Sequence, residues 1–135
     1  MRKEKRYRLQ RYGKLLMLKA TVADTEGIYQ SIRLLVDTGA TYTVLPASFL
    51  RQMGYDVANP LRLVRISAAN GVLDVPFLKV DRFCCLGQDV ADFSVVALDL
   101  PPSAVISGLL GMDFLEAHQA LIDTGKAEIV IQVEN

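Results

Sequence analysis

The chain has 135 residues, of which 51% are hydrophobic and 22% charged, with 15 basic and 15 acidic side chains. This length indicates one domain, and the hydrophobic content is too high for a disordered chain. No apolar run approaches the ~20 residues of a membrane-spanning helix, so we expect no membrane span.

The balanced charge hides an asymmetry along the chain. Residues 1–19 contain eight basic side chains and one acidic side chain, a net charge of +7, whereas the remaining residues carry a net charge of −7. We interpret residues 1–13 as a basic N-terminal arm, in the simplest case a solvated tail, and residues 14–135 as the folded domain. Contact of the arm with nucleic acid, an acidic membrane or the protein's own acidic surface is the alternative.

Apolar residues recur at period two in short runs, which is typical of half-buried strands. The run from Ile32 to Val36 is nearly all apolar, which indicates burial on both faces. Asn70-Gly71 is the strongest hairpin signal and suits a type I′ turn. The predicted strands are Leu15–Val22, Tyr29–Val36, Tyr42–Leu45, Leu61–Ala68, Val72–Val80, Phe93–Leu98, Ala120–Ile122 and Ala127–Val133, and the run from Val105 to Leu110 is apolar and bounded by glycine. Short helices are predicted over Pro46–Met53 and Gly111–His118, so we expect a mainly-β barrel or sandwich.

The cysteines and the histidine exclude several kinds of site. Cys84 and Cys85 are the only cysteines, and adjacent cysteines have poor geometry for bridging each other. A chain without a disulfide framework fits a reducing compartment, so we expect a cytoplasmic location. His118 is the only histidine and lies in a predicted helix, so we expect no metal site, no cofactor and no Ser-His-Asp triad.

The most informative segment is Asp37-Thr38-Gly39-Ala40, directly after the most apolar predicted strand. A carboxylate at the end of a buried strand is costly unless it is paired or functional. Gly39 allows a backbone or ligand to approach closely, and a carboxylate on such a rigid loop is suited to acid or base catalysis.

This segment resembles the active-site loop of the retropepsin-like aspartic proteases. Two further elements occur in the family's order: the Asn70-Gly71 hairpin, where the family has its flap, and the run from Gly108 to Leu115, which is similar to the family's hydrophobic-hydrophobic-glycine motif and C-terminal helix. The resemblance covers about residues 14–133. It implies a mainly-β, retropepsin-like closed β-barrel, the acid protease fold with one lobe per chain and two short helices.

The resemblance also implies a mechanism with two aspartates around one water. One aspartate is charged and acts as base, and the other is protonated and acts as acid, because two carboxylates so close share a proton. The second Asp-Thr-Gly, at residues 123–125, is followed by Lys126 and by too few residues for a second lobe, so we interpret it as a polar hairpin turn. The second aspartate should then be Asp37 of another copy in a homodimer acting on polypeptides.

Other roles follow from the resemblance, one residue at a time. Thr38 is expected to form a reciprocal hydrogen-bond grip between the two loops, with Gly39 close to the substrate backbone and Ala40 completing the loop. The remaining expected positions are the flap tip, Ala68, Ala69, Asn70 and Gly71; the pocket wall, Leu109 with Ile106 nearby; and the support behind the loop, Gly111 and Asp113. Whether the C-terminal hairpin enters the dimer sheet or caps the barrel stays open.

Two other functions remain as alternatives. The first is a retropepsin-like module that dimerises or binds peptides without cleaving them, in which Asp37 is a structural remnant. The second is a nucleic-acid-binding β-barrel that uses the basic arm. We expect no nucleic-acid partner, because the body of the chain is acidic and no strand interleaves aromatic and basic residues.

Overall fold

The computed structural model describes residues 1–68, 71–101 and 106–134, which fold as a mainly-β protein with two short helices. The strands are β1 (Arg2–Arg8), β2 (Gln10–Tyr12), β3 (Leu15–Ala23), β4 (Tyr29–Val36), β5 (Val44–Leu45), β6 (Arg62–Ala68), β7 (Gly71–Cys85), β8 (Gln88–Ala97), β9 (Gly108–Leu110), β10 (Leu121–Asp123) and β11 (Glu128–Glu134). The helices are α1 (Ala47–Gln52) and α2 (Met112–Ala117).

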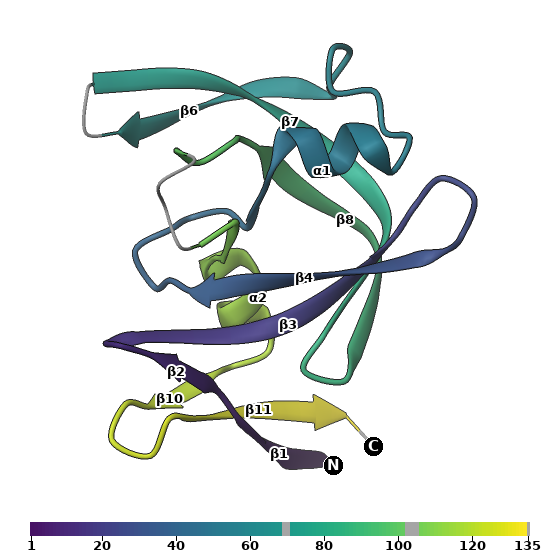
Figure 1. Ribbon diagram of the computed structural model, residues 1–135. Helices are drawn as coiled ribbons and strands as arrows, with labels where there is room; N and C mark the ends of the chain where they lie inside the picture. The colour runs from purple at the N-terminus through teal and green to yellow at the C-terminus, as the bar shows by residue number, and fades with distance from the viewer. Residues whose placement is uncertain (69–70, 102–105, 135) are drawn as a thin grey trace.

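The larger sheet closes into a barrel. Its strands follow the order β2-β3-β4-β9-β5-β8-β7-β6, and an additional pairing of β3 with β7 closes the ring. The β6–β7 hairpin extends beyond this ring at one end, and the three-stranded sheet β1-β11-β10 lies at the other end (Figure 1). The predicted closed barrel is therefore confirmed.

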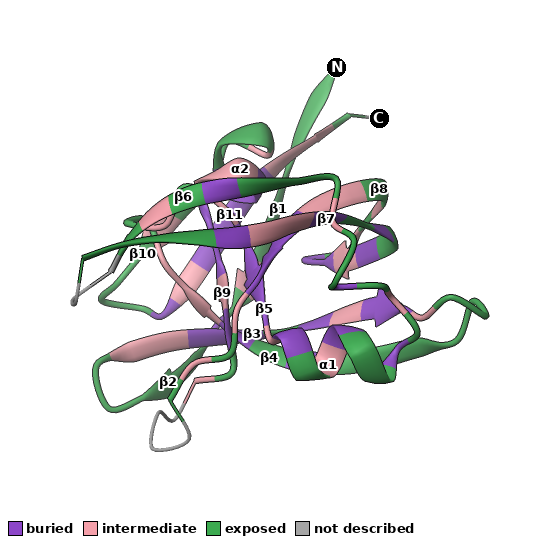
Figure 2. Ribbon diagram, turned by 90° about the horizontal axis from the view of Figure 1, so that it is seen from above, coloured by how far each residue is buried: buried purple, intermediate pink, exposed green. Residues whose placement is uncertain are grey.

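The barrel core forms where the inward faces of the strands meet. Leu18, Ala20 and Val22 are buried along β3 while Lys19 is exposed, as the period-two pattern predicts. Phe83 stacks on Phe93, and the ring of Phe114 from α2 meets that of Phe83 edge-on at 5.7 Å. Buried segments gather where the strands cross in the middle of the molecule, and turns are exposed (Figure 2).

Strand β4 is buried less completely than its sequence indicates. Leu34 is fully buried, but Leu35 and Val36 are half-buried and Arg33 is exposed. The prediction that the run from Ile32 to Val36 is buried on both faces is therefore wrong for Arg33, Leu35 and Val36, because the outer face of the barrel is only partly covered here.

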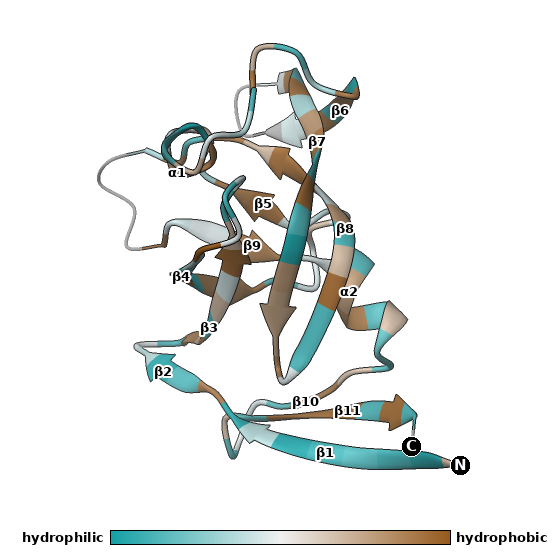
Figure 3. Ribbon diagram, turned by 90° about the vertical axis from the view of Figure 1, so that its right-hand side faces the viewer, coloured by the Kyte–Doolittle hydropathy of each residue, from teal (hydrophilic) through white to brown (hydrophobic). Residues whose placement is uncertain are grey.

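The basic arm is not a solvated tail. β1 pairs antiparallel with β11 from Arg2↔Glu134 to Arg8↔Glu128, and Leu9 is buried in the core. β1 is mostly hydrophilic (Figure 3), and all of its residues but Tyr7 are exposed, so the pairing uses backbone hydrogen bonds that the side-chain pattern does not reveal. Arg2 contacts Glu134 at 3.4 Å and Arg6 contacts Glu128 at 3.0 Å. The arm therefore contacts acidic groups of its own chain, through exposed pairs that contribute ~0–1 kcal/mol each.

Most element boundaries differ from the predicted ones by one to three residues, and β7 and β8 are longer by about five residues each at the turn that joins them. The predicted helix starting at Pro46 begins one residue later, with Pro46 as its N-cap. Strand β7 ends at Cys85 and strand β8 begins at Gln88. A tight turn joins them, in which Leu86 and Gly87 both have positive φ. The sequence did not reveal this turn, because leucine rarely adopts positive φ. No helix within the described ranges is long and apolar enough to cross a membrane.

Gly108 provides a test of how tightly the barrel closes beside the loop after β4. A Cβ at this position would collide with the carbonyl oxygen of Val44 and lie 2.8 Å from Cδ2 of Leu34. Gly108→Ala should lower the free energy of unfolding by roughly 1–3 kcal/mol, the usual cost of overpacking. In Gly125→Ala the nearest atom is 3.5 Å away, so this control should change stability by less than about 0.5 kcal/mol. Urea denaturation measures the free energy of unfolding of both variants. Equal destabilisation by the two substitutions would contradict the close packing around Gly108.

The buried thiol of Cys85 makes the free energy of unfolding depend on pH in the alkaline range. Burial, with a smaller contribution from neighbouring Cys84, raises the pKa of the Cys85 thiol from 9.0 to about 12. Between these values the unfolded chain has lost the proton and the folded protein keeps it, so the free energy of unfolding falls as pH rises from about 9 to 12. Urea denaturation across this window should show a shallower fall for Cys85→Ala than for the wild type. If the free energy of unfolding falls equally with pH in both proteins, the Cys85 thiol does not contribute to the pH dependence.

Candidate active site

Asp37 begins a tight loop at the end of β4. Its backbone N–H donates to the carbonyl oxygen of Leu110 at 3.0 Å, and its own carbonyl accepts the N–H of Ala40 at 3.2 Å. The carboxylate atom Oδ1 accepts the N–H of Gly39 at 2.9 Å. Asp37 is half-buried, whereas Thr38 and Gly39 are exposed. The loop thus holds a carboxylate in a fixed orientation at the edge of the barrel.

Gly111 and the first residues of α2 lie directly behind this loop. The N–H of Met112 donates to the carbonyl oxygen of Ala40 at 2.8 Å, and that of Asp113 donates to Thr41 at 3.2 Å. A Cβ at Gly111 would lie 2.6 Å from the carbonyl group of Tyr42. Only glycine allows the two backbones to approach this closely.

Hydrogen bonds of the buried Thr43 join the same two segments. The Thr43 side chain is fully buried; its hydroxyl donates to Asp113 Oδ1 at 2.8 Å, and its backbone N–H donates to Oδ2 at 2.9 Å. The same hydroxyl accepts the N–H of Gly111 at 3.2 Å, and the N–H of Phe114 donates to Asp113 Oδ1 at 2.8 Å. Thr43 was not predicted as a site residue, because a threonine in a β-rich run also suits an ordinary strand.

A cavity of about 560 Å³ opens beside Asp37. Its lining is mainly apolar, with polar groups at the loop and on β6. The lining residues are Asp37, Gly39, Ala40, Thr41, Tyr42, Val44, Arg65, Ile66, Ser67, Val96, Leu98 and Leu109. Leu109 is thus in the wall, as expected, whereas Ile106 is half-buried and is not among these residues.

The β6–β7 hairpin forms one side of the cavity. The two strands pair antiparallel up to Ala68↔Gly71, which confirms the predicted hairpin. Ala69 and Asn70, and with them the predicted type I′ turn, lie outside the described residues, as does the side chain of Ala68. Among the strands of the described residues β6 is the last in the sheet, so one of its backbone edges has no strand partner there, and Arg65, Ile66 and Ser67 of β6 line the cavity.

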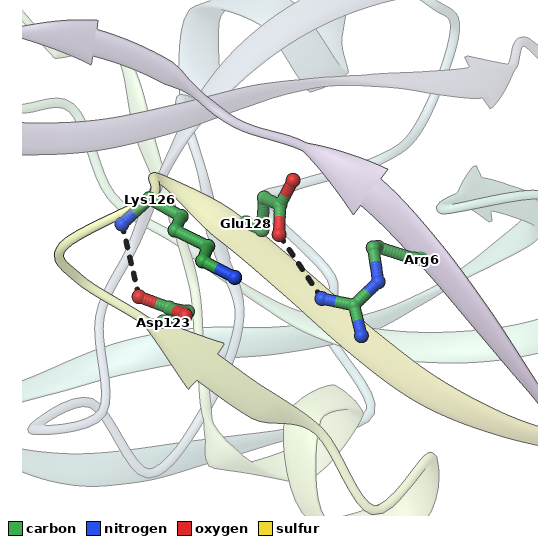
Figure 4. A network of polar contacts seen from close by, with 4 residues as sticks. All are labelled: Arg6, Asp123, Lys126 and Glu128. Carbon is green, nitrogen blue, oxygen red and sulfur yellow. Dashed lines mark hydrogen bonds and ion pairs between the residues drawn. The ribbon is translucent and has the colours of Figure 1, made fainter.

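Asp123 lies elsewhere, in the β10–β11 hairpin. Its Oδ1 accepts the N–H of Lys126 at 2.9 Å, and the turn faces the ion pair between Arg6 and Glu128 (Figure 4). Asp123 is not among the residues that line the cavity. The interpretation of this second Asp-Thr-Gly as a hairpin turn is confirmed.

The side chain of His118 packs against α2. Its ring stacks on Phe114 with centroids 4.2 Å apart, and Nδ1 lies 3.0 Å from the carbonyl oxygen of Phe114. Within residues 1–68, 71–101 and 106–134, no group of three or more His, Cys, Asp or Glu side chains is placed to hold a metal ion. Cys84 and Cys85 are free.

Comparisons with known proteins identify this arrangement. Residues 18–114 match the family model described as aspartyl protease. The crystal structure of a retropepsin-like aspartic protease from Rickettsia conorii is similar with a TM-score of 0.71 at 19% identity, over 98% of this chain and 93% of that chain. The retroviral protease-like domain of Ddi1 from Leishmania major is similar with a TM-score of 0.52 at 16% identity, over 81% of each chain. No curated protein matches the sequence.

The family match covers most of the chain and contains the whole loop from Asp37 to Ala40, the cavity residue Leu109 and the supporting residue Asp113. The structural likeness independently gives the same barrel. The chain therefore belongs to the aspartyl protease family, the aspartic-type endopeptidases, and has the retropepsin-like fold.

Proposed function

We propose that the protein cleaves polypeptides as a homodimer in which each copy supplies one catalytic Asp37. The observation that carries this proposal is the unequal placement of the two Asp-Thr-Gly segments. Asp37 borders the large cavity, whereas Asp123 sits in a surface hairpin. One chain thus offers one usable carboxylate, and a two-fold symmetric pair supplies the second from an identical chain.

In this mechanism the two Asp37 carboxylates face each other across the symmetry axis and share one proton. The ionised carboxylate takes a proton from a water molecule, which attacks the carbonyl carbon of the scissile peptide bond. The protonated carboxylate donates to the carbonyl oxygen as the tetrahedral intermediate forms. The hydrogen bond from Gly39 N–H to Asp37 Oδ1 supports this role, because it fixes the carboxylate without neutralising it.

The cavity favours an extended peptide with apolar side chains. The unpaired edge of β6 offers backbone groups to such a peptide, as in β-strand addition. Val44, Val96 and Leu109 provide an apolar wall. We assign the flap to the β6–β7 hairpin and the wall position near the scissile bond to Leu109.

The other loop residues have supporting roles in the proposal. Thr38, exposed beside Asp37, contacts the partner's loop, and Gly39 lets the substrate backbone approach. Gly111 and Asp113 hold the loop from behind, as their contacts with Tyr42 and Thr43 suggest. The free cysteines support a reducing, cytoplasmic location.

The two Asp-Thr-Gly segments provide a matched test. Asp37→Asn should lower the cleavage of denatured proteins by at least about 10²-fold, because an amide cannot act as the base. The fold should persist, since the amide oxygen can still accept the Gly39 N–H. Asp123→Asn is the control: its amide oxygen can likewise accept the Lys126 N–H, and activity should stay unchanged.

Peptide release measured by mass spectrometry, with circular dichroism of each variant, decides the outcome. Loss of activity in folded Asp123→Asn but not in Asp37→Asn would reverse the assignment. A folded, dimeric wild-type protein that binds peptides and cleaves none would favour the non-catalytic module.

A further inference from the structure

A pocket lined by three arginines lies over β2, β3 and β4, where the barrel adjoins the three-stranded sheet (Figure 1). Its volume is about 430 Å³, within the ~300–1,000 Å³ that is usual for small-molecule sites. Arg8, Arg11 and Arg33 line it, and no acidic residue of the part of the chain that the structure describes is among its lining residues. None of its residues lines the cavity beside Asp37, so it is a separate site.

The pocket is on the outer face of the barrel. Met17 opposes Leu35 in the β3–β4 register, and Arg33 is two residues before Leu35, so all three side chains project from one face of the sheet. Leu34, between them in sequence, points the other way and is fully buried in the barrel core.

An apolar floor closes the pocket from below. Met17 and Leu9 both line it and are each only 3% exposed. Tyr12 also lines it and is 55% exposed, so its ring is accessible to a ligand. A bound molecule would therefore meet an apolar base, an aromatic ring and guanidinium groups.

Two cations beside the pocket are placed directly against each other. Lys19 opposes Arg33 in register, and both are exposed. Like charges in such a cross-strand pair are destabilising. Charged side chains often protect a sheet edge from pairing, but β3 and β4 are interior strands. Among the residues that the structure describes, neither cation forms an ion pair. A bound anion would remove this repulsion.

The other two arginines complete the cationic lining. Glu128 opposes Arg8 in register, but its carboxylate pairs with Arg6 at 3.0 Å, and Arg8 has no ion pair within the described ranges. Nη2 of Arg11 donates to the carbonyl oxygens of Thr124 and Gly125 at 2.9 and 3.2 Å. These bonds hold the Arg11 side chain beside the pocket.

We propose that this pocket binds a small phosphate monoester, with the phosphate group between Arg8 and Arg33 and the organic part against Tyr12. A phosphate monoester has about −1.5 to −2 charges and three acceptor oxygens at neutral pH, so it can bind guanidinium groups from two strands at once. Guanidinium groups match phosphate oxygens in bidentate hydrogen bonds. A carboxylate, with one charge and two oxygens, satisfies fewer of these donors.

The first test measures binding of phenyl phosphate by isothermal titration calorimetry at constant ionic strength. Arg8→Gln and Arg33→Gln should each weaken binding at least about tenfold, because each removes a charged hydrogen-bond donor. Arg51→Gln, at an exposed position of α1, is the matched control and should keep the wild-type dissociation constant. Without ligand, Arg33→Gln should melt at the wild-type temperature or above it, because the repulsion with Lys19 is gone.

Absence of saturable binding to the wild type would overturn the proposal. Equal weakening by Arg51→Gln would overturn it too, since any exposed arginine would then have the same effect. Arg33→Gln that binds normally but melts at a lower temperature would show that Arg33 has only a structural role.

The second test identifies the chemical class of the ligand. Phenyl phosphate should bind more tightly than inorganic phosphate and than benzoate, and Tyr12→Ala should reduce its affinity to that of inorganic phosphate. Equal affinity of the wild type for both phosphates would overturn the monoester assignment and leave inorganic phosphate as the ligand. Benzoate that binds as tightly as phenyl phosphate would overturn the preference for phosphate. Tighter binding of a single-stranded oligothymidylate, weakened by Arg33→Gln, would overturn the proposal in favour of nucleic acid.

Discussion

The site depends on one contact of the buried Thr43, whose hydroxyl and backbone N–H donate to the half-buried Asp113 carboxylate at 2.8 and 2.9 Å. This contact fixes the segment after the Asp37 loop to the start of α2, and a half-buried carboxylate that lost these donors would be left with unsatisfied acceptors. The close approach of Gly111 to Tyr42 makes the same crossing possible. Precise placement of Asp37 is therefore a consequence of packing behind the loop as much as of the loop itself.

Much of this arrangement could be predicted from the sequence, because the relevant constraints are local. An apolar strand that ends in Asp37 and Gly39 predicts a carboxylate on a tight loop, and the structure has that loop. Asn70-Gly71 between two alternating runs predicts the β6–β7 hairpin. Each of these features follows from residues close together in the chain, where period and turn chemistry are informative.

The features that the sequence did not reveal depend on distant partners. β1 pairs with β11 through backbone groups that any sequence provides, so its charged side chains suggested a tail. Thr43 acts in the site only because Asp113, far away in the chain, reaches it. Leu86 adopts positive φ because the turn joins two long paired strands. In each case the tertiary context outweighs a local preference.

In the proposed mechanism one active site contains Asp37 from two chains. Mixing the wild type with an excess of Asp37→Asn protein, under conditions in which subunits exchange, tests it directly. If two Asp37 residues are needed, mixed dimers are inactive, and activity falls with the square of the wild-type fraction. Activity that stays proportional to the amount of wild-type chain would show that one chain is sufficient and would contradict the account.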